Sequence, residues 1–257
     1  MDLNTLKNGK KYMKINKVKS LGSWITTYNP GVVDIMSSNH FKWLAIDLEH
    51  STISLSEAEE LIQIILKNKC TPYVRVGKNN ELIIKKALDA GALGIIVPNI
   101  INSTDAKKAV NYSKYPPKGT RGVGLARAQL YGKNFKEYLK ISKTIKLILQ
   151  IENKSAIENL NSILSTKYID GTIIGPYDLS ASFNKMGKLN DNIVLKAINI
   201  YEKLSKKYNI PMGYHVVNLD HKFLIKKIKK NYQYLAYGTD MIFLEQSINK
   251  ELKKIIN

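Results

Sequence analysis

Residues 43–76 read WLAIDLEHSTISLSEAEELIQIILKNKCTPYVRV, and this stretch contains one complete strand–helix–strand unit. Its two ends, residues 43–47 and 71–76, are apolar runs that are too short for a buried helix and are typical of strands buried on both faces. Between them, residues 54–68 begin with a serine at a capping position, carry acidic residues in the first turn, and place Leu61, Ile64 and Ile65 on one helical face.

The same alternation continues along the chain. Six further apolar runs have the length of a strand, namely LGSWITTY (21–28), LGIIVP (93–98), KLILQIE (146–152), DGTIIGP (170–176), PMGYHVV (211–217) and YLAYGTDMIFL (234–244). Helical spacing fills the intervals between them, and about eight strand–helix repeats predict an α/β fold, a single (β/α)8 TIM barrel. An open doubly wound sheet is the alternative, but it prefers a glycine-rich phosphate turn after the first strand, and TTYNPGVVD (26–34) does not supply one.

The chain shows no linker and no shift in composition, so we expect one domain over residues 1–257, with the barrel core at about residues 20–245. One long irregular segment, YPPKGTRGVGLARAQLYGKNF (115–135), follows the fourth predicted strand. Its proline pair and its glycines predict a loop, and a loop of this length in a compact barrel is usually part of the active site.

The charge of the chain is strongly positive. Lys and Arg number 40 against 21 Asp and Glu, which gives a net charge of +19, and only three of the basic residues are Arg. Nucleic-acid-binding surfaces favour Arg, whereas the lysines of this chain are spread over polar helix faces. We therefore expect a solvated, compositionally biased surface and no nucleic-acid partner, with a functional polyanion-binding surface as the alternative.

Other features of the sequence restrict the class of protein. The single Cys70 excludes an internal disulfide and a cysteine-cluster zinc site, and it fits a reducing compartment. No stretch approaches the roughly 18 apolar residues of a membrane span, and residues 1–20 contain no apolar core of signal-peptide length. We expect a cytoplasmic protein without a membrane partner.

Polar residues gather where the predicted strands end, which is where barrel enzymes place their active sites. These residues are Asp47, Glu49, His50, Arg75, Gln150, Glu152, Asp178 and His215. Gln150 and Glu152 are two positions apart, so on a strand they point to the same side. A carboxylate in an apolar strand such as LILQIE must be paired, protonated or bound to a metal.

The residues alone leave several roles open. Glu152 with Asp178 suits one hard divalent cation such as Mg²⁺ or Mn²⁺, but an ion pair of Glu152 with a neighbouring Lys or Arg fits equally well. His50 is a candidate general base, or a surface or packed histidine, as we expect of His40 and His221. Arg75 should face an anion, which is either structural or a substrate carboxylate or enolate.

Several motifs, in this order and spacing, carry a resemblance to a known family: WLAIDLEH, PYVRVGKNN, YPPKGTRGVG, LQIE and IGPYDLSASF. Together they resemble the HpcH/HpaI aldolase family of class II, metal-dependent pyruvate aldolases, including its 2,4-dihydroxyhept-2-ene-1,7-dioate aldolase-like members. The similarity runs from LGSWI near residue 21 to YGTDMIFL near residue 241. It implies a (β/α)8 barrel of the phosphoenolpyruvate/pyruvate-domain type, commonly a homo-hexamer, as a trimer of dimers, in which a terminal helix is exchanged between paired subunits.

The resemblance also implies roles for individual residues. Glu152 and Asp178 would hold the metal ion, which is Mg²⁺, Mn²⁺ or Co²⁺, and His50 would serve as acid and base. Arg75 would stabilise a pyruvate enolate, and Asp89 would pair with the base, sometimes from a neighbouring subunit. Gln150 and the backbone around Tyr177 and Asp178 would hold pyruvate.

Two positions depart from the family pattern. Tyr177 stands where a small residue is common, which is tolerable if only its backbone N–H is used. His215 stands where some members carry an apolar residue that lines the aldehyde pocket, so it indicates either a more polar aldehyde or a packed histidine. Arg121 and Arg127 lie in the long loop, where they would close over the aldehyde end or contact a phosphate or carboxylate there. The alternative is that they lie at a subunit interface.

The resemblance implies reversible cleavage of a 4-hydroxy-2-oxo acid to pyruvate and an aldehyde through a metal-stabilised enolate. The nearest alternative is a class I aldolase that uses one of the many lysines as a Schiff base. A related carbon–carbon lyase of the acyl-CoA type, similar to citrate or malyl-CoA lyases, is a second alternative. A basic polyanion-binding protein is a third.

Overall fold

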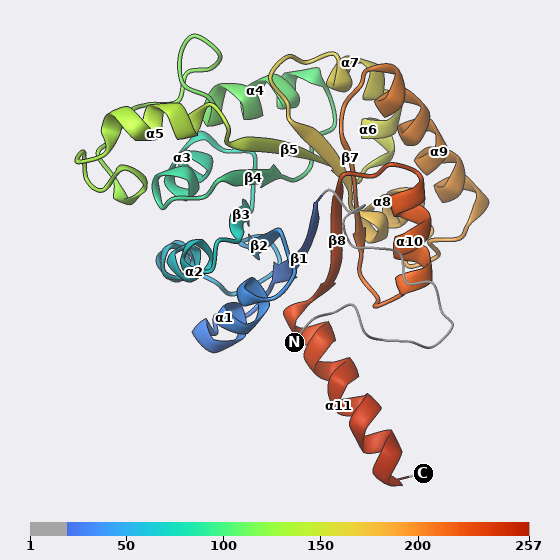
Figure 1. Ribbon diagram of the computed structural model, residues 1–257. Coiled ribbons are helices and arrows are strands. Elements are labelled where there is room, and N and C mark those ends of the chain that lie inside the picture. Colours follow the sequence, from blue (N-terminus) through green and yellow to red (C-terminus); the bar gives the residue numbers. More distant parts are fainter. Residues whose placement is uncertain (1–19, 257) are drawn as a thin grey trace.

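The computed structural model describes residues 20–256, and these residues form a closed barrel of eight parallel strands that are hydrogen-bonded in chain order (Figure 1). The strands are β1 (Leu21–Ile25), β2 (Trp43–Asp47), β3 (Thr71–Arg75), β4 (Gly94–Val97), β5 (Lys146–Ile151), β6 (Gly171–Ile174), β7 (Met212–Val216) and β8 (Tyr234–Thr239). The barrel closes because β1 pairs in parallel with β8. The predicted (β/α)8 barrel is therefore confirmed.

Helices follow the strands and cover the outside of the barrel. They are α1 (Pro30–Ser38), α2 (Leu55–Lys67), α3 (Glu81–Asp89), α4 (Ser103–Ser113), α5 (Phe135–Ser142), α6 (Lys154–Glu158), α7 (Leu160–Leu164), α8 (Pro176–Ser182), α9 (Asn192–Lys207), α10 (His221–Lys229) and α11 (Asp240–Ile256). The predicted cap at Ser54 is present, since its side chain accepts from Glu57 N–H while the Glu57 carboxylate accepts from Ser54 N–H.

The interior of the barrel is filled by side chains that point inward from alternate positions of the strands. This inner core consists of Trp24, Trp43, Ala45, Tyr73, Ile96, Ile148, Ile173 and Ala236. Trp43 stacks on Tyr73 with ring centroids 5.1 Å apart. The neighbouring strands carry Gly22 and Gly94 at the positions that face these two rings, where any Cβ would collide with them. The interior of the barrel is thus a packed core, and a substrate can bind only at its mouth.

The long segment between β4 and β5 is more ordered than a simple loop. It contains a short 3₁₀ helix, η2 (Arg127–Gln129), and continues into α5. Gln129 is fully buried, and its side-chain amide donates to the carbonyl of Gly124. These contacts fold the segment back onto itself beside α3.

Helix α11 extends away from the barrel, and of its residues only Asp240 is buried (Figure 1). The Asp240 carboxylate fixes the start of the helix by accepting from the backbone N–H groups of Thr26 and Thr27. One face of the exposed part carries an apolar stripe made of Met241, Leu244, Ile248, Leu252 and Ile255. In residues 20–256, no helix has the length and apolar character needed to cross a bilayer.

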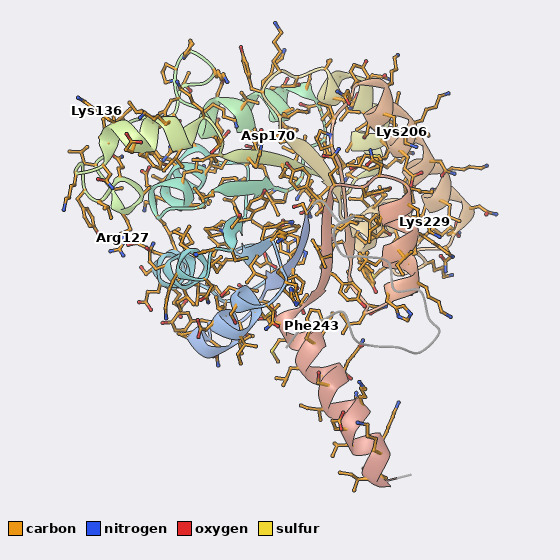
Figure 2. The ribbon with its side chains drawn as sticks, in the orientation of Figure 1. Arg127, Lys136, Asp170, Lys206, Lys229 and Phe243 are labelled. Carbon is orange, nitrogen blue, oxygen red and sulfur yellow. The ribbon has the colours of Figure 1, made fainter. Side chains whose placement is uncertain are left out.

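Lysines project outward around the barrel, as Lys136, Lys206 and Lys229 do in Figure 2. Lys114 and Lys227 are the exceptions that matter, since each is buried and ion-paired. The first 19 residues, in which the sequence shows no signal-peptide core, lie outside the described part of the chain.

Candidate active site at the carboxyl ends of the strands

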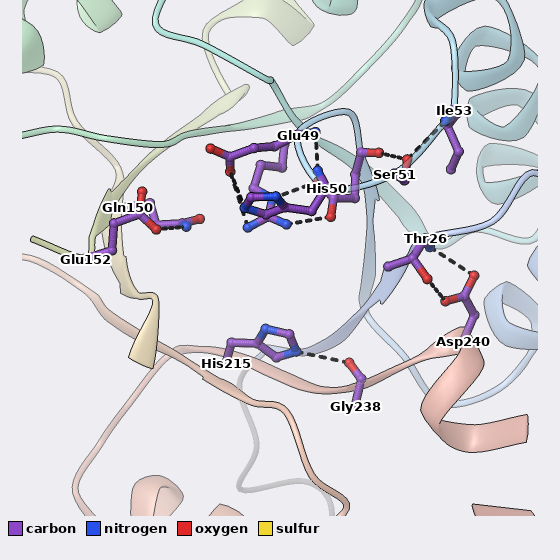
Figure 3. Close-up of polar contacts among 12 residues, drawn as sticks. Thr26, Glu49, His50, Ser51, Ile53, Gln150, Glu152, His215, Gly238 and Asp240 are labelled. Atoms are coloured by element: carbon purple, nitrogen blue, oxygen red, sulfur yellow. Dashed lines mark hydrogen bonds and ion pairs between the residues drawn. The ribbon is translucent and has the colours of Figure 1, made fainter. Parts of the chain in front are cut away.

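Most of the predicted polar residues meet at the mouth of the barrel (Figure 3). The register of the sheet brings the first two together, because β2 and β3 pair with Asp47 directly beside Arg75. Gln150 and Glu152 lie at the end of β5, and both are buried. His215 projects from β7 toward the same space.

Arg75 is held by two carboxylates. Its Nε and Nη2 donate to the two oxygens of Asp47 at 2.8 and 2.5 Å, and its Nη1 lies 3.4 Å from Oε2 of Glu49. The anion expected beside Arg75 is therefore present within the protein. Burial would raise the pKa of Asp47, but the Arg75 guanidinium and two backbone N–H groups outweigh it and lower the pKa.

The surroundings of Glu49 disfavour the ionised form of its carboxyl group. Burial raises its pKa to about 7, and the carboxylates of Glu152 and Asp178 add to the effect, while Arg75 opposes it. Its Oε2 atom is buried without a hydrogen-bond partner in the described part of the chain. The mouth of the barrel thus holds more carboxyl groups than Arg75 alone can neutralise.

Glu152 lies deep in the mouth, where it is 6% exposed. Its Oε1 accepts from the backbone N–H of Asn99 at 2.8 Å, and its Oε2 accepts from the side-chain amide of Gln150. Burial raises its pKa and the carboxylate of Asp178 adds to this, although the two hydrogen bonds and Arg75 oppose it. Within residues 20–256 no basic side chain forms an ion pair with Glu152, so the ion pair left open by the sequence is not formed there.

Space beside Glu152 depends on Gly175, at the end of β6. A Cβ at this position would lie 2.7 Å from Oε2 of Glu152 and 3.2 Å from the amide nitrogen of Gln150. Any other residue at position 175 would therefore displace the two side chains. Asp178 lies just beyond, exposed in the first turn of α8.

These residues fit a divalent cation. Glu152 is a buried carboxylate without a cationic partner in the described residues, Asp178 is close enough to raise its pKa, and the buried Oε1 of Gln150 has no hydrogen-bond partner. Residues 20–256 contain no group of three or more His, Cys, Asp or Glu side chains arranged for a metal. The donor set therefore matches an open site that is completed by water and substrate oxygens, as Mg²⁺ prefers, and does not match a closed structural site.

The structure does not bring His50 and Asp89 together within one chain. The side chain of His50 is 63% exposed at the rim, with Nε2 3.9 Å from Glu49. Asp89 ends α3 and binds the fully buried guanidinium of Arg121 at 2.6 Å. Arg121 is also covered by Tyr115 and Tyr138, with its Cζ 4.6 and 5.7 Å from the ring centroids.

Arg121 is therefore not the substrate-facing loop arginine that the sequence suggested, because its side chain is turned into the protein. The reason is that Asp89 offers it a buried ion pair and two aromatic rings offer it cation–π contacts, which compensate the loss of water. Arg127 is different, since its guanidinium is partly exposed and lies 3.3 Å from the side-chain oxygen of Gln63.

His215 is packed and also lines the mouth. Its ring lies 5.3 Å from the Trp24 ring, and its Nε2 lies 3.2 Å from the carbonyl of Gly238. Burial lowers the pKa of His215 to about 3, so the imidazole is neutral at ordinary pH. Tyr177 is 40% exposed beside it at the start of α8.

The sequence did not single out Trp24, which completes the site. Its ring lies inside the barrel with the Arg75 guanidinium 4.5 Å from its centroid, so it shields one face of the cation. The available signal was its position near the end of the first apolar run. Trp24, Arg75, Gln150, Asp178 and His215 are among the residues that line a small space of about 60 Å³, here called the inner cavity.

A closed parallel barrel with buried acids and an arginine at the carboxyl ends of its strands has the architecture of a (β/α)8-barrel enzyme. The HpcH/HpaI aldolase/citrate lyase family matches residues 20–245 of the chain. The chain belongs to this family and is accordingly a carbon–carbon lyase of the aldolase type.

Two relatives and one solved structure illustrate the match. The chain is 33% identical to the hydroxypyruvate/pyruvate aldolase of Sagittula stellata over 224 residues, which cover 86% of this chain and 87% of the relative. It is 30% identical to the 5-keto-4-deoxy-D-glucarate aldolase of Enterobacter sp. over 194 residues, covering 75% and 76%. A family protein from Burkholderia cenocepacia superposes with a TM-score of 0.88 at 24% identity, covering 94% and 96%, and supports the fold.

Proposed function

We propose that the protein catalyses the reversible cleavage of a 4-hydroxy-2-oxo acid to pyruvate and an aldehyde. The observation that carries this proposal is the buried Glu152, which accepts two hydrogen bonds, has no basic side chain of residues 20–256 as an ion-pair partner, and lies close enough to Arg75 for the guanidinium to lower its pKa. A metal-bound 2-oxo acid needs a carboxylate ligand and a nearby positive group that stabilises its enolate. The names of the two relatives, both aldolases, support the same reaction.

Glu152 and Asp178 would hold the divalent ion, which is Mg²⁺, Mn²⁺ or Co²⁺. When bound, the ion would supply Lewis acidity to the keto and carboxylate oxygens of the substrate. Gln150 would orient the oxo acid through its side chain, and the backbone N–H groups of Tyr177 and Asp178 would bind the carboxylate of pyruvate. The inner cavity, with a volume of about 60 Å³, is lined by Gln150 and Asp178 and would receive the oxo-acid end of the substrate.

Arg75 would stabilise the negative charge that develops on the enolate oxygen. Asp47 fixes the guanidinium in one plane through two hydrogen bonds, so the group need not reorganise when charge appears. Trp24 covers one face of the cation and excludes water from it.

His50 would take the proton of the 4-hydroxyl group in cleavage and return it in condensation. Its exposure at the rim lets it approach a substrate that extends out of the inner cavity. Asp89 faces Arg121 and lies apart from His50 in the same chain, so we propose that the Asp89 that orients His50 comes from a second copy.

The assembly would be a homo-hexamer built as a trimer of dimers, in which paired subunits exchange α11. The support is the apolar stripe of α11, whose side chains are exposed on a helix that extends away from the barrel (Figure 1). Such a stripe is stable in water only when another apolar surface covers it.

The decisive experiment combines pyruvate with a panel of aldehydes in the presence of Mg²⁺, Mn²⁺ or Co²⁺. We expect aldol products that disappear with EDTA and return with added metal. Borohydride with pyruvate tests the class I alternative, because only a Schiff-base enzyme gains mass at a lysine. Activity that persists in EDTA, or a trapped pyruvate adduct, would overturn the proposal.

A further inference from the structure

A second and larger space lies on the outside of β7, between α9 and α10. This outer cavity has a volume of about 350 Å³, and its walls include Leu195, Ile198, Tyr214, Val217, Phe223 and Lys227. Its volume falls in the range of pockets that bind small organic molecules. The reaction proposed above uses none of the side chains that line only this cavity.

The outer cavity adjoins the inner cavity. Both are lined by Pro176, Tyr177, His215 and Val217, so these four residues form a common wall. His215 is central to it, because it projects from β7 into the mouth while the preceding Tyr214 packs with Phe223 on the outer side, ring centroids 5.4 Å apart. A substrate whose oxo-acid end fills the inner cavity would meet this wall with its other end.

One side of the outer cavity offers aromatic surface, and the charges buried there are paired, whereas the charged Asp220 and Lys226 also line the cavity. The Lys227 ammonium lies 4.2, 4.6 and 5.2 Å from the ring centroids of Tyr214, Tyr232 and Phe223. It donates to the Tyr232 hydroxyl at 3.2 Å and lies 3.5 Å from the Glu202 carboxylate.

Glu202 in turn accepts from Lys230 at 2.7 Å and from the Tyr232 hydroxyl at 2.9 Å. The buried charges are thus matched by one another. A charged ligand group placed against the aromatic side would have to break this pairing, whereas an apolar group there would displace only water.

We propose that the outer cavity is the subsite for the distal end of the aldehyde, and that it accepts an apolar chain or ring. The inference rests on the proposed aldol reaction and adds the substrate class. The inner cavity takes the three-carbon oxo acid, His215 and Val217 lie beside the new C–C bond, and the rest of the aldehyde extends along Leu195 and Ile198 toward Tyr214 and Phe223.

The first measurement is a series of straight-chain aldehydes from acetaldehyde to hexanal, each condensed with pyruvate. Each methylene buried in the outer cavity raises kcat/KM by up to about fourfold, until the cavity is filled. A flat series, or a preference for a carboxylate-terminated aldehyde over the alkyl aldehyde of equal length, would overturn the inference. Absence of aldol product with every aldehyde would instead overturn the proposed function.

A matched pair of variants on α9 tests the location. Leu195→Trp places an indole in the outer cavity, and Ile200→Trp places one on the same helix at a residue that does not line the cavity. The two native residues are 41% and 45% exposed, so both substitutions should be tolerated. We expect Leu195→Trp to lower kcat/KM for hexanal at least tenfold and to leave acetaldehyde unchanged, and Ile200→Trp to change neither.

A binding measurement without catalysis completes the test. Titration of the metal-free protein with 1-hexanol should shift the NMR signals of Tyr214 and Phe223, and Leu195→Trp should abolish the shifts. If hexanol binds there but kcat/KM does not depend on chain length, the cavity is a separate site and the inference is wrong. If Leu195→Trp lowers the activity with acetaldehyde and hexanal equally, the inference is also wrong.

Discussion

The guanidinium of Arg75 meets the carboxylate of Asp47 edge to edge, with Nε 2.8 Å from Oδ1 and Nη2 2.5 Å from Oδ2. The sheet itself creates this pair, because Asp47 ends β2, Arg75 ends β3, and the two residues are partners in the parallel register. Two hydrogen bonds in one plane fix both the position and the rotation of the guanidinium, which a single point charge cannot achieve.

Replacement of Arg75 by lysine should therefore damage catalysis although the charge is kept. We expect kcat for pyruvate condensation to fall about 10²- to 10³-fold, since a lysine makes only a single contact with Asp47 and leaves the enolate oxygen without its fixed donor. Steady-state kinetics with pyruvate and one aldehyde provide the measurement. Lys78→Arg, at an exposed position beyond β3, is the control, and a kcat within threefold of wild type for Arg75→Lys would contradict the assigned role.

Replacement of Glu152 by glutamine separates metal binding from folding. The glutamine can still accept the Asn99 N–H, but it removes the negative charge, so calorimetric affinity for Mn²⁺ should fall more than tenfold and aldol activity should be lost.

Although Glu152→Gln should weaken metal binding, it should make the metal-free protein more stable at high pH. Because the folded-state pKa of Glu152 is raised, the metal-free wild type loses stability as the pH rises through this titration, and the glutamine variant does not. Urea unfolding at half-unit pH steps upward from pH 4.5, the ordinary pKa of the glutamate, measures the difference, with Glu158→Gln on the surface of α6 as the control. A variant that binds Mn²⁺ like wild type would refute the assignment.

Much of the barrel could be read from the sequence, because apolar strand runs and amphipathic helices follow local periodicity. Glu152 stood out for a similar reason, as an acid in an apolar strand. The sequence could not identify the anion that pairs with Arg75, because this pairing depends on the register between β2 and β3, which no local pattern encodes. The sequence left Arg121 open between a substrate-facing role and a subunit interface, because a glycine-rich segment does not reveal which of its side chains turns inward toward Asp89.

The apolar stripe of α11 predicts that the quaternary structure depends on this helix. Leu244 and Ile248 are 50% and 49% exposed and lie one turn apart on the same face. Changing both to glutamate should reduce the mass measured by light scattering from a multiple of 29.1 kDa to smaller species, and activity should fall with it. Ser247→Glu, also exposed on α11, is the control. An unchanged mass for the double variant would show that the stripe is not an interface.

His215 makes the folded protein sensitive to acid. Its pKa is lowered from 6.5 to about 3 by burial, so below pH 6.5 the unfolded chain binds a proton that the folded chain does not. Stability is therefore complete above pH 6.5 and decreases by up to about 1.4 kcal/mol per pH unit as the pH falls toward 3.

His215→Phe should reduce this decrease between pH 6.5 and 4.5. The carbonyl of Gly238 keeps a donor in the variant, since Ser23 Oγ lies 3.3 Å from it. Urea unfolding at half-unit pH steps, compared with the exposed His40→Gln, gives the slopes. Equal slopes for the wild type and His215→Phe would mean that His215 is protonated in the fold.

Lys227 gives a pH dependence of the same sign as that of His215, but at higher pH. Burial lowers its pKa from 10.5 to about 8, and the attraction of Glu202 only partly offsets this. Between pH 8 and 10.5 the unfolded chain holds a proton that the folded chain has lost, so stability rises with pH in this range, and the full cost of the buried ammonium applies below pH 8.

Lys227→Met should therefore stabilise the protein by about 1–3 kcal/mol at pH 7, and the gain should shrink as the pH rises toward 10. Glu202 remains paired in the variant, because Lys230 and the Tyr232 hydroxyl both still donate to it. Urea unfolding at pH 7 and 9.5 measures the effect, with the neighbouring exposed Lys226→Met as the control. A loss of stability at pH 7 would show that the contacts of the ammonium with the three rings and with Glu202 exceed the cost of burying it.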